Sequence, residues 1–280
     1  MLRTRIVTAV FLLAGLSCAL FFFPPMPWVA CCALICAVAA WEWAGLAGWS
    51  SKARIAYGAV LGISCFILGY MGIEKLSLFW GGSSVVAEIY VTIALVLGLF
   101  AVAFWLLIVP FWLKYKWPLR TWNAAVTGVL VLLPPTLVFI ALRAFAGPEF
   151  VLMAAALVWV ADIAAYFSGR AFGRRKLAPN ISPGKTWAGA VGATLGVMLY
   201  GSIVSMATIS SVSLSRFLLL QLVFIGLSVL SIVGDLFESL LKRQAGVKDS
   251  SNLLPGHGGV LDRIDSLTST LPMVVIVIVA

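Results

Sequence analysis

Charged side chains are scarce in this chain, and that scarcity excludes a soluble globular domain. Only 10% of its 280 residues are Asp, Glu, Lys or Arg, whereas soluble domains carry about 25%. Hydrophobic residues make up 62% of the chain and form long apolar runs. The composition therefore predicts an all-α, polytopic integral membrane protein whose core consists of helices packed in lipid.

Cysteine and histidine do not occur with the spacing of a metal-binding motif. The five cysteines lie in apolar runs between residues 18 and 65, and the single histidine is His257. Cysteines in such surroundings are typical packing residues of proteins in a reducing compartment. We therefore interpret all five as helix-packing side chains.

Nine apolar runs are long enough to cross a bilayer as helices, which takes about 17–25 residues. The fourth is the least sharply bounded, because it continues past Pro110 and follows a segment, 76–86, that could be interfacial or re-entrant. The chain shows no repeat, which weighs against an inverted-repeat transporter. We predict a single transmembrane domain over residues 1–280, with N-terminal helices in 1–120 and the polar, catalytic helices and loops in 121–280. The expected spans are 6–23, 28–47, 56–73, 86–109, 124–144, 150–168, 187–207, 215–235 and 265–280.

The basic residues lie mostly on one side of these spans. Of the 19 Lys and Arg residues, all but Lys75, Arg143 and Arg216 lie on the side of the N-terminus. Basic loops stay in the cytoplasm, so this bias places the two longest polar loops there. It also explains the net charge of +9 without a nucleic-acid partner. We predict a multi-pass protein of the cell (inner or plasma) membrane, with its active site facing the cytoplasm.

The first polar loop, residues 162–189, combines an acidic residue with many cations. Asp162 lies near the end of the sixth expected span, and Tyr166 follows one helical turn later on the same face. The loop also contains four glycines and five basic residues. An ordinary basic anchor loop would have the same composition, so this loop alone does not define a site.

The segment 182–186, Ser-Pro-Gly-Lys-Thr, has part of a P-loop pattern. A P-loop needs a glycine where this chain has Pro179, and we expect no strand before the segment. The alternative is a turn that includes Ser182, Lys185 and Thr186, opens the next helix and presents backbone N–H groups to a phosphate.

The second polar loop is more specific, because five of the ten carboxylates lie between Asp235 and Asp265. Asp235, Glu238 or Ser239, and Lys242 are spaced to share one helix face. The Pro-Gly-His-Gly-Gly run around His257 describes a tight turn with bare backbone that a ligand can approach closely. Charges so close to apolar spans are costly and mark a functional site.

Three aspartates could hold hard cations at this loop. Asp235 and Asp262 belong to two different expected helix ends, and Asp265 shares a helix face with Asp262. Oxygen ligands, few in number, suit Mg²⁺ that also binds substrate phosphates. The alternative is that these are solvated charges and helix caps, with Asp262 interacting only with a helix dipole.

The motifs of both loops resemble those of the phosphatidate cytidylyltransferases (CDP-diacylglycerol synthases), and the multi-span layout extends this resemblance over essentially the whole chain. The second loop carries Ser239-Leu-Leu-Lys-Arg, Lys248-Asp249, His257-Gly-Gly and Leu261-Asp-Arg-Ile-Asp265. The first loop carries Asp162-x-x-Ala-Tyr-x-x-Gly and Ser182-Pro-x-Lys-Thr-Trp-x-Gly.

The resemblance implies transfer of a cytidylyl group from CTP to phosphatidate at the bilayer, with release of pyrophosphate. It implies Mg²⁺ as the cofactor, with two divalent-cation sites, one of which could take a monovalent cation. A homodimer is compatible with the sequence. The implied catalytic residues are Asp235, Asp262, Lys242, Lys248, Asp249 and His257. The implied substrate-binding residues are Ser182, Lys185, Thr186, Ser239, Arg243, Gly258, Gly259, Arg263, Asp162 and Tyr166, and the metal ligands are Asp235, Asp262 and Asp265.

Two other functions remain as alternatives. A CTP-dependent polyprenol or lipid-alcohol kinase would need a base beside a hydroxyl group. An ion-coupled transporter would place its acidic residues at mid-membrane, whereas Asp162, Asp235 and Asp262 are expected at cytoplasmic helix ends. Glu42 and Glu88 lie nearer the apolar runs. We interpret both as structural, with Glu42 reaching the interface by snorkelling.

Overall fold

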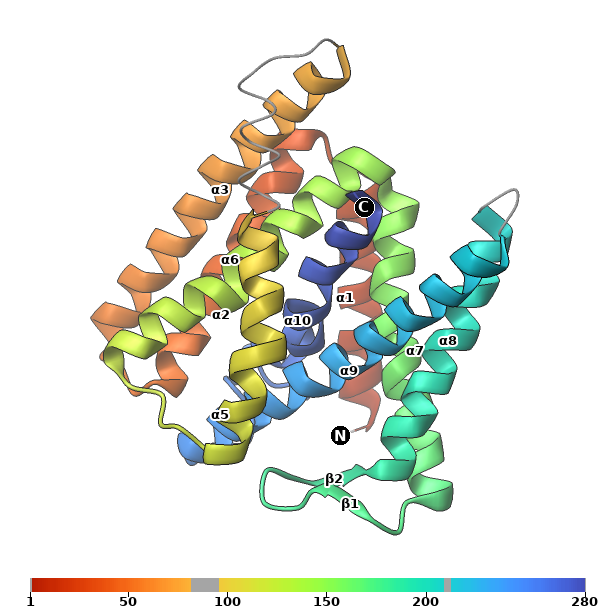
Figure 1. The fold of residues 1–280 in the computed structure, drawn as a ribbon. Coiled ribbons are helices and arrows are strands. Elements are labelled where there is room, and N and C mark those ends of the chain that lie inside the picture. Colours follow the sequence, from red (N-terminus) through yellow and green to blue (C-terminus); the bar gives the residue numbers. More distant parts are fainter. Residues whose placement is uncertain (1, 82–95, 209–212, 280) are drawn as a thin grey trace.

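The structure is a bundle of helices that run back and forth between two ends of the molecule (Figure 1). The computed structural model describes residues 2–81, 96–208 and 213–279. Seven of its helical stretches are long and apolar enough to cross a membrane, so the all-α, polytopic prediction is confirmed. The helices are α1 (Leu2–Phe22), α2 (Pro25–Leu46), α3 (Ser51–Gly81), the π-helical turn η1 (Phe104–Ile108), α5 (Val109–Tyr115), α6 (Thr121–Ala146), α7 (Pro148–Phe172), α8 (Trp187–Thr208), α9 (Leu214–Gln244) and α10 (Leu261–Val279).

The seven long apolar stretches correspond to the second to eighth expected spans. The first expected span corresponds to the shorter apolar helix Ile6–Phe22 within α1, and the ninth corresponds to α10. Part of the fourth expected span, residues 86–95 with Glu88, lies outside the described residues, as does residue 280 of the ninth.

Two helices continue beyond the expected ends of their spans. α7 ends at Phe172 and α9 at Gln244, so Asp162 and Asp235 lie inside helices and not at their ends. Hydropathy falls where charged residues begin, but the backbone hydrogen bonds of a helix do not depend on hydropathy. Basic residues in the last turns of both helices favour these longer ends, because they interact with the helix dipole.

The polar segment between α7 and α8 forms a β-hairpin that the sequence did not predict. β1 (Lys176–Ala178) and β2 (Ser182–Thr186) pair in antiparallel fashion, with Lys176 opposite Thr186. The expected turn at 182–186 is therefore an extended strand, and the expectation that no strand precedes it was wrong. The segment is still no P-loop, because its Gly-Lys-Thr lies in a strand and not in a loop that wraps a phosphate.

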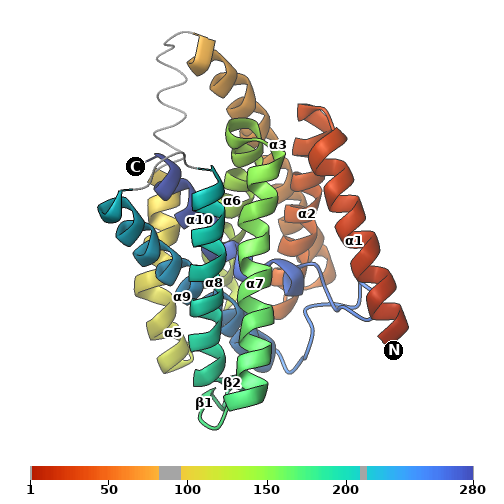
Figure 2. The same ribbon diagram turned by 90° about the vertical axis from the view of Figure 1, so that its right-hand side faces the viewer.

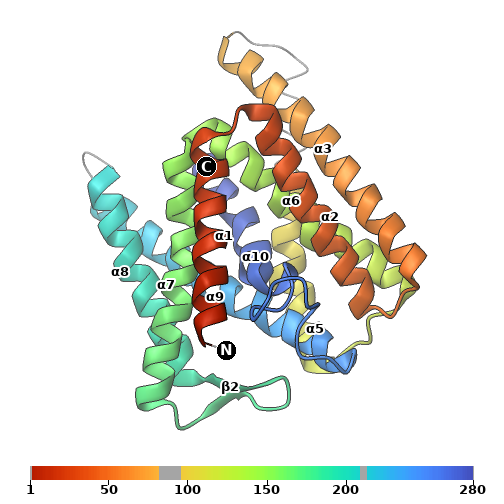
Figure 3. The same cartoon turned by 180° about the vertical axis from the view of Figure 1, so that it is seen from behind.

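Both polar segments lie at the same end of the bundle. Figures 1 and 2 show the hairpin, the segment 245–260 between α9 and α10, and the last turn of α5 together at this end. The view from behind shows that the N-terminus of α1 reaches the same end (Figure 3). Here the hydroxyl of Thr8 donates a hydrogen bond to the carbonyl of Pro255, at 3.0 Å. The N-terminus and both polar segments therefore lie at one end of the bundle, as the distribution of Lys and Arg predicts.

An aromatic cluster fixes α9 against the N-terminal helices. The ring of Phe237 lies 5.4–6.2 Å from the rings of Trp43 on α2, Phe104 and Trp105 on η1, and Trp112 on α5. Edge-to-face contacts at such distances add to the gain from burial. The cluster holds α9 in place directly beside its polar residues.

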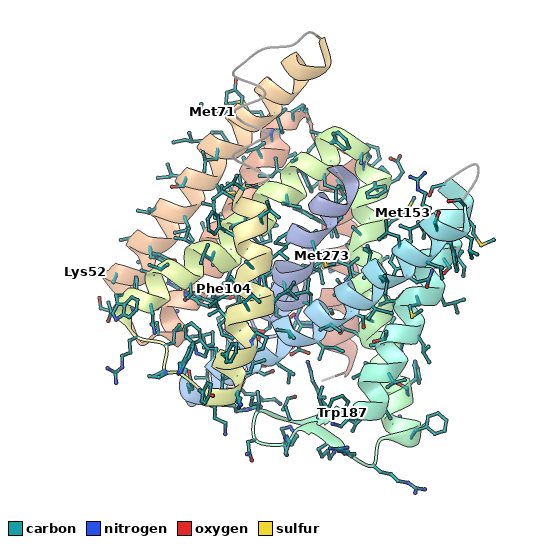
Figure 4. All side chains as sticks on the ribbon, in the orientation of Figure 1. Lys52, Met71, Phe104, Met153, Trp187 and Met273 are labelled. Atoms are coloured by element: carbon teal, nitrogen blue, oxygen red, sulfur yellow. The ribbon has the colours of Figure 1, made fainter. Side chains whose placement is uncertain are left out.

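α7 and α8 pack closely because small residues face each other. A Cβ atom on Gly196 would lie only 2.7 Å from the Cβ of Ala164. The two helices span the bundle from end to end. Figure 4 shows Met153 of α7 near one end, and Trp187, the first residue of α8, beside the hairpin at the other end. The same view shows Met273 of α10 among the helices, where it packs against both hydrophobic clusters of the core.

Candidate functional site

A cavity of about 360 Å³ lies between α7, the hairpin, α8 and α9. Nearly half of its lining residues are glycine or alanine, which leaves room for a ligand. Its charged and aromatic lining comes from both polar segments of the chain. These residues are Asp162, Tyr166 and Arg170 on α7, Lys176 and Lys185 on the hairpin, and Asp235 on α9.

An ion pair joins the two polar segments inside this cavity. Lys185 on β2 contacts the carboxylate of Asp235 on α9, and the two side chains are 23% and 30% exposed. The hydroxyl of Ser239, one turn later on α9, donates to Asp235 at 3.3 Å. The structure thus brings together Lys185, Asp235 and Ser239, three of the residues predicted from the motifs. Because the pair is open to the cavity, a ligand can reach both charges.

Thr186 and Ser182 contribute to the site in different ways. Thr186 lines the cavity but is only 6% exposed, and its hydroxyl accepts a hydrogen bond from the backbone N–H of Gly189 at 3.1 Å. This bond caps the start of α8. Ser182 pairs with Ala178 in the hairpin and is not among the residues that line the cavity. The observed contacts of these two residues therefore position the hairpin.

Asp262, at the start of α10, is enclosed by hydrogen-bond donors. Its Oδ1 accepts from the ammonium of Lys242 at 2.6 Å. Its Oδ2 accepts from the N–H and hydroxyl of Ser250, at 2.8 and 2.9 Å, and from the N–H of Gly259, at 2.8 Å. Burial alone would raise the pKa of this carboxyl, but these donors favour the charged form and hold the pKa below its usual value. Asp262 is therefore a fixed negative charge.

Glu238 extends this network. The sequence had indicated only that Glu238 could share a helix face with Asp235. The ammonium of Lys242 lies 3.2 Å from Glu238 Oε2 as well as close to Asp262. Glu238 is 3% exposed, and its Oε1 has no hydrogen-bond partner among the described residues. Asp265 lies near enough to interact electrostatically with both Glu238 and Asp235. A line of acidic side chains thus runs from the cavity to Asp262.

Glu42 is the residue that sequence reasoning misinterpreted. It was expected to reach the membrane interface by snorkelling, but its exposed fraction is 0%. Its carboxylate accepts four hydrogen bonds from the segment that leads into α10. The one available signal was a carboxylate inside an apolar run, which is costly unless it is satisfied by partners.

The glycine-rich turn adopts a conformation that few side chains allow. Gly258 has a φ of +82°, in the left-handed region. A Cβ on Gly259 would lie 2.5 Å from Glu42 Oε1 and even closer to the hydroxyl of Ser250. The backbone N–H of His257 donates to the carbonyl of Leu254 at 2.9 Å, while its buried Nδ1 has no partner among the described residues. The turn therefore positions Asp262, and the role of the imidazole stays a prediction.

The other predicted residues of the second loop lie at the surface. Among the described residues none of them forms an ion pair, so the three cations in this set can attract an anionic ligand. Arg263 is near enough to Asp162 to interact with it electrostatically, although it does not line the cavity. The exposed residues are Arg243, Lys248, Asp249 and Arg263.

The three predicted metal ligands do not form one cluster. Among the described residues there is no group of three or more acidic, histidine or cysteine side chains arranged to hold an ion. Asp235 and Asp262 instead contact two different lysines. The donor set still fits a hydrated Mg²⁺: Asp162 and Asp235 line one cavity, and Mg²⁺ commonly uses one or two carboxylates with waters and phosphates. The metal roles stay predictions.

Comparison with known proteins identifies the family. The model of the cytidylyltransferase family matches residues 3–280. The chain is 40% identical over 276 residues to the phosphatidate cytidylyltransferase of Pseudomonas aeruginosa, which covers 98% of this chain and 95% of the relative. It is 35% identical over 289 residues to the phosphatidate cytidylyltransferase of Haemophilus influenzae, and this match covers 97% of this chain and 96% of the relative. The resemblance seen in the motifs is therefore confirmed, and the chain belongs to the cytidylyltransferase family.

Proposed function

We propose that this protein transfers the cytidylyl group of CTP to phosphatidate, forming CDP-diacylglycerol and releasing pyrophosphate. Family membership and the names of its relatives support this reaction. The structural observation that carries it is the Lys185–Asp235 ion pair, which joins the two polar segments inside one cavity.

The reaction depends on positioning two anions. A phosphate oxygen of the lipid attacks the α-phosphorus of CTP, the bond from that phosphorus to the oxygen bridging to the β-phosphate breaks, and pyrophosphate leaves. The nucleophile is already ionised at neutral pH, so little is required of a general base. Arg170, Lys176 and Lys185 line the cavity and offer positive charge where negative charge accumulates. A phosphate that binds Lys185 competes with Asp235 for the ammonium group.

Mg²⁺ would supply further charge neutralisation and stabilise the leaving pyrophosphate. We propose Asp235 as its ligand in the cavity, with Asp262 as the second predicted ligand. A cation bound directly by Asp262 Oδ1 would compete with the ammonium of Lys242, which donates to this oxygen at 2.6 Å. Asp265, the third predicted ligand, interacts electrostatically with Asp235. Occupancy is tested by the Mg²⁺ and K⁺ dependence of turnover in wild-type, Asp235→Asn and Asp262→Asn proteins.

We propose that the end of the bundle with both polar segments faces the cytoplasm, where CTP is available. A cysteine at Leu253, which is 50% exposed, is a suitable probe in a chain cleared of its five native cysteines. It should resist a membrane-impermeant thiol reagent in intact cells and react after permeabilisation. Labelling of intact cells would reverse the orientation. A homodimer stays a prediction, checked by the mass of the detergent-solubilised protein.

One assay separates this reaction from the alternatives. Purified protein is incubated with α-³²P-labelled CTP, Mg²⁺ and phosphatidate, and the products are separated. Cytidylyl transfer puts the label into lipid and releases unlabelled pyrophosphate, whereas a lipid-alcohol kinase leaves the label in CDP. Asp162 and Asp235 lie inside helices and not at their ends, so ion transport has to be tested directly. A protein that moves ions across vesicles and yields no labelled lipid would refute the proposal.

A further inference from the structure

Glu42 is a fully buried carboxylate that belongs to no part of the cavity. It lies near the C-terminal end of α2, in the N-terminal half of the chain, and its exposed fraction is 0%. None of the ion pairs formed by the described residues includes it. A buried charge without a counter-ion needs other stabilisation, and here hydrogen bonds provide it.

All four observed donors to Glu42 come from the segment that follows α9. Oε1 accepts from the hydroxyl of Ser251 at 2.6 Å and from the N–H of Val260 at 3.0 Å. Oε2 accepts from the hydroxyl of Ser250 at 3.1 Å and from the N–H of Leu261 at 2.7 Å. The donors lie at the two ends of the segment 250–261, with the glycine-rich turn between them. One side chain of α2 therefore closes this segment into a loop.

The two backbone donors also belong to the N-terminus of α10. The first N–H groups of a helix have no partner within the helix, and the helix dipole favours a negative charge there. Glu42 supplies both the acceptor and the charge, from more than 200 positions away in the sequence. The direction in which α10 begins, and with it the position of Asp262, thus depends on α2.

A single hydroxyl connects Glu42 to Asp262. The Oγ atom of Ser250 lies 3.1 Å from Glu42 Oε2 and 2.9 Å from Asp262 Oδ2. A hydroxyl has only one proton to donate, so the two carboxylates compete for it and their positions are coupled. From Asp262 the network continues to Lys242 and Glu238. These contacts also require that residue 259 has no side chain, because a Cβ at Gly259 would clash with both Glu42 and Ser250.

We infer that Glu42 is a positioning residue for Asp262, acting through the segment 250–261 and the first turn of α10. The inference rests on the proposed cytidylyl transfer, in which Asp262 is a fixed charge of the active site. It makes α2, which contributes no residue to the cavity lining, a part of the active-site framework. The N-terminal helices would then do more than anchor the catalytic helices in the membrane.

Glu42→Gln is the sharpest variant, because it keeps the size of the side chain and removes only its charge and two acceptor positions. The new NH₂ group must face one hydroxyl donor and one backbone N–H donor, whichever way the amide is turned. Outer partners of active-site groups typically contribute about 10- to 100-fold to activity. We expect kcat to fall by about 10- to 100-fold, with the KM for CTP changed much less. Exchange of the amide hydrogens of residues 250–261 should be faster than in the wild type.

Trp43→Phe is the matched control. Trp43 is the next residue of α2 and is 1% exposed. The substitution removes one buried hydrogen bond, the 2.9 Å bond from Trp43 Nε1 to the carbonyl of Ala124 on α6. It should lower the unfolding temperature while leaving kcat of the folded protein and amide exchange in 250–261 unchanged. Ser250→Ala combined with Glu42→Gln should cost less than the product of the two single effects, because both act through one contact.

The inference requires that kcat and exchange change together in Glu42→Gln. It is overturned if kcat of the folded protein stays within twofold of wild type, if exchange in 250–261 is unchanged, or if Trp43→Phe gives the same pattern. The exchange measurement in nanodiscs needs no substrate, so it tests the contacts of Glu42 by itself. A wild-type protein that makes no CDP-diacylglycerol would instead refute the proposed function.

Discussion

Asp235 and Asp262 carry the same chemical group, but the structure holds them in different ways. Asp235 lines the cavity, its side chain is 30% exposed, and it has one lysine and one hydroxyl as partners. The side chain of Asp262 is 3% exposed and has four donors within hydrogen-bond distance, one of which, the Ser250 hydroxyl, it shares with Glu42. A carboxylate of the first kind can exchange its partners for a ligand, whereas one of the second kind is preorganised by its surroundings. Stability and activity should therefore respond differently at the two positions.

The largest effect is expected from replacing either aspartate by asparagine. Both changes remove a negative charge from the site, and each should lower turnover by about 100-fold or more. Only Asp262→Asn should also lower the unfolding temperature, because its amide group cannot satisfy the donors around it and leaves Lys242 with less compensation. Turnover and thermal unfolding of both proteins in detergent test this. Equal unfolding temperatures would show that the two carboxylates do not differ as described.

A somewhat smaller effect is expected at Lys185, the partner of Asp235. Lys185→Ala should lower turnover by about 10- to 100-fold, and Lys185→Arg should restore only part of it, since a planar fork cannot replace a point charge at fixed reach. Arg174→Ala is the matched control, because Arg174 lies just before the same hairpin but does not line the cavity. Lys176, on the first strand of the hairpin, also lines the cavity. Full activity in both Lys185 variants would reduce the hairpin to a membrane anchor.

The sequence predicted what depends on local pattern. Apolar runs located the helices, and the spacing of Asp235, Ser239 and Lys242 correctly placed them on one helix face. The ends of α7 and α9 were wrong, because hydropathy marks where lipid ends and not where a helix ends. The β-hairpin was missed because strands of three and five residues that contain proline and glycine give no recognisable alternation.

The role of Glu42 could not have been predicted from local pattern at all. Its donors lie more than 200 residues away, and no motif connects them. The same holds for Asp235 on α9 and Lys185 on β2, which are 50 residues apart in the sequence and meet only through the packing of α9 against the hairpin. The motifs named the residues of the site, and tertiary packing decided which of them pair.

A moderate effect on stability is expected at Gly259, in the turn that encloses Asp262. Gly259→Ala forces a methyl group against Glu42 and Ser250, and overpacking of this kind costs about 1–3 kcal/mol. Gly15→Ala on α1 is the control, because nothing lies within 4 Å of a Cβ at that position. We expect a lower unfolding temperature and reduced turnover for Gly259→Ala only. If both variants unfold at the wild-type temperature, the loop is less tightly held than the contacts of Asp262 imply.

The smallest effect is expected at Tyr166, which lines the open cavity together with Asp235. Its side chain is 58% exposed, and its hydroxyl accepts a 3.1 Å hydrogen bond from Arg170, which also lines the cavity. Loss of such an exposed bond is worth about 1 kcal/mol at most. Tyr166→Phe should therefore raise the KM for one substrate by a few-fold and leave kcat and the unfolding temperature nearly unchanged. A loss of kcat as large as that of Asp235→Asn would instead mean that the phenol contacts the reacting phosphates, and the open wall of the cavity would then include a third catalytic group beside Asp235 and Lys185.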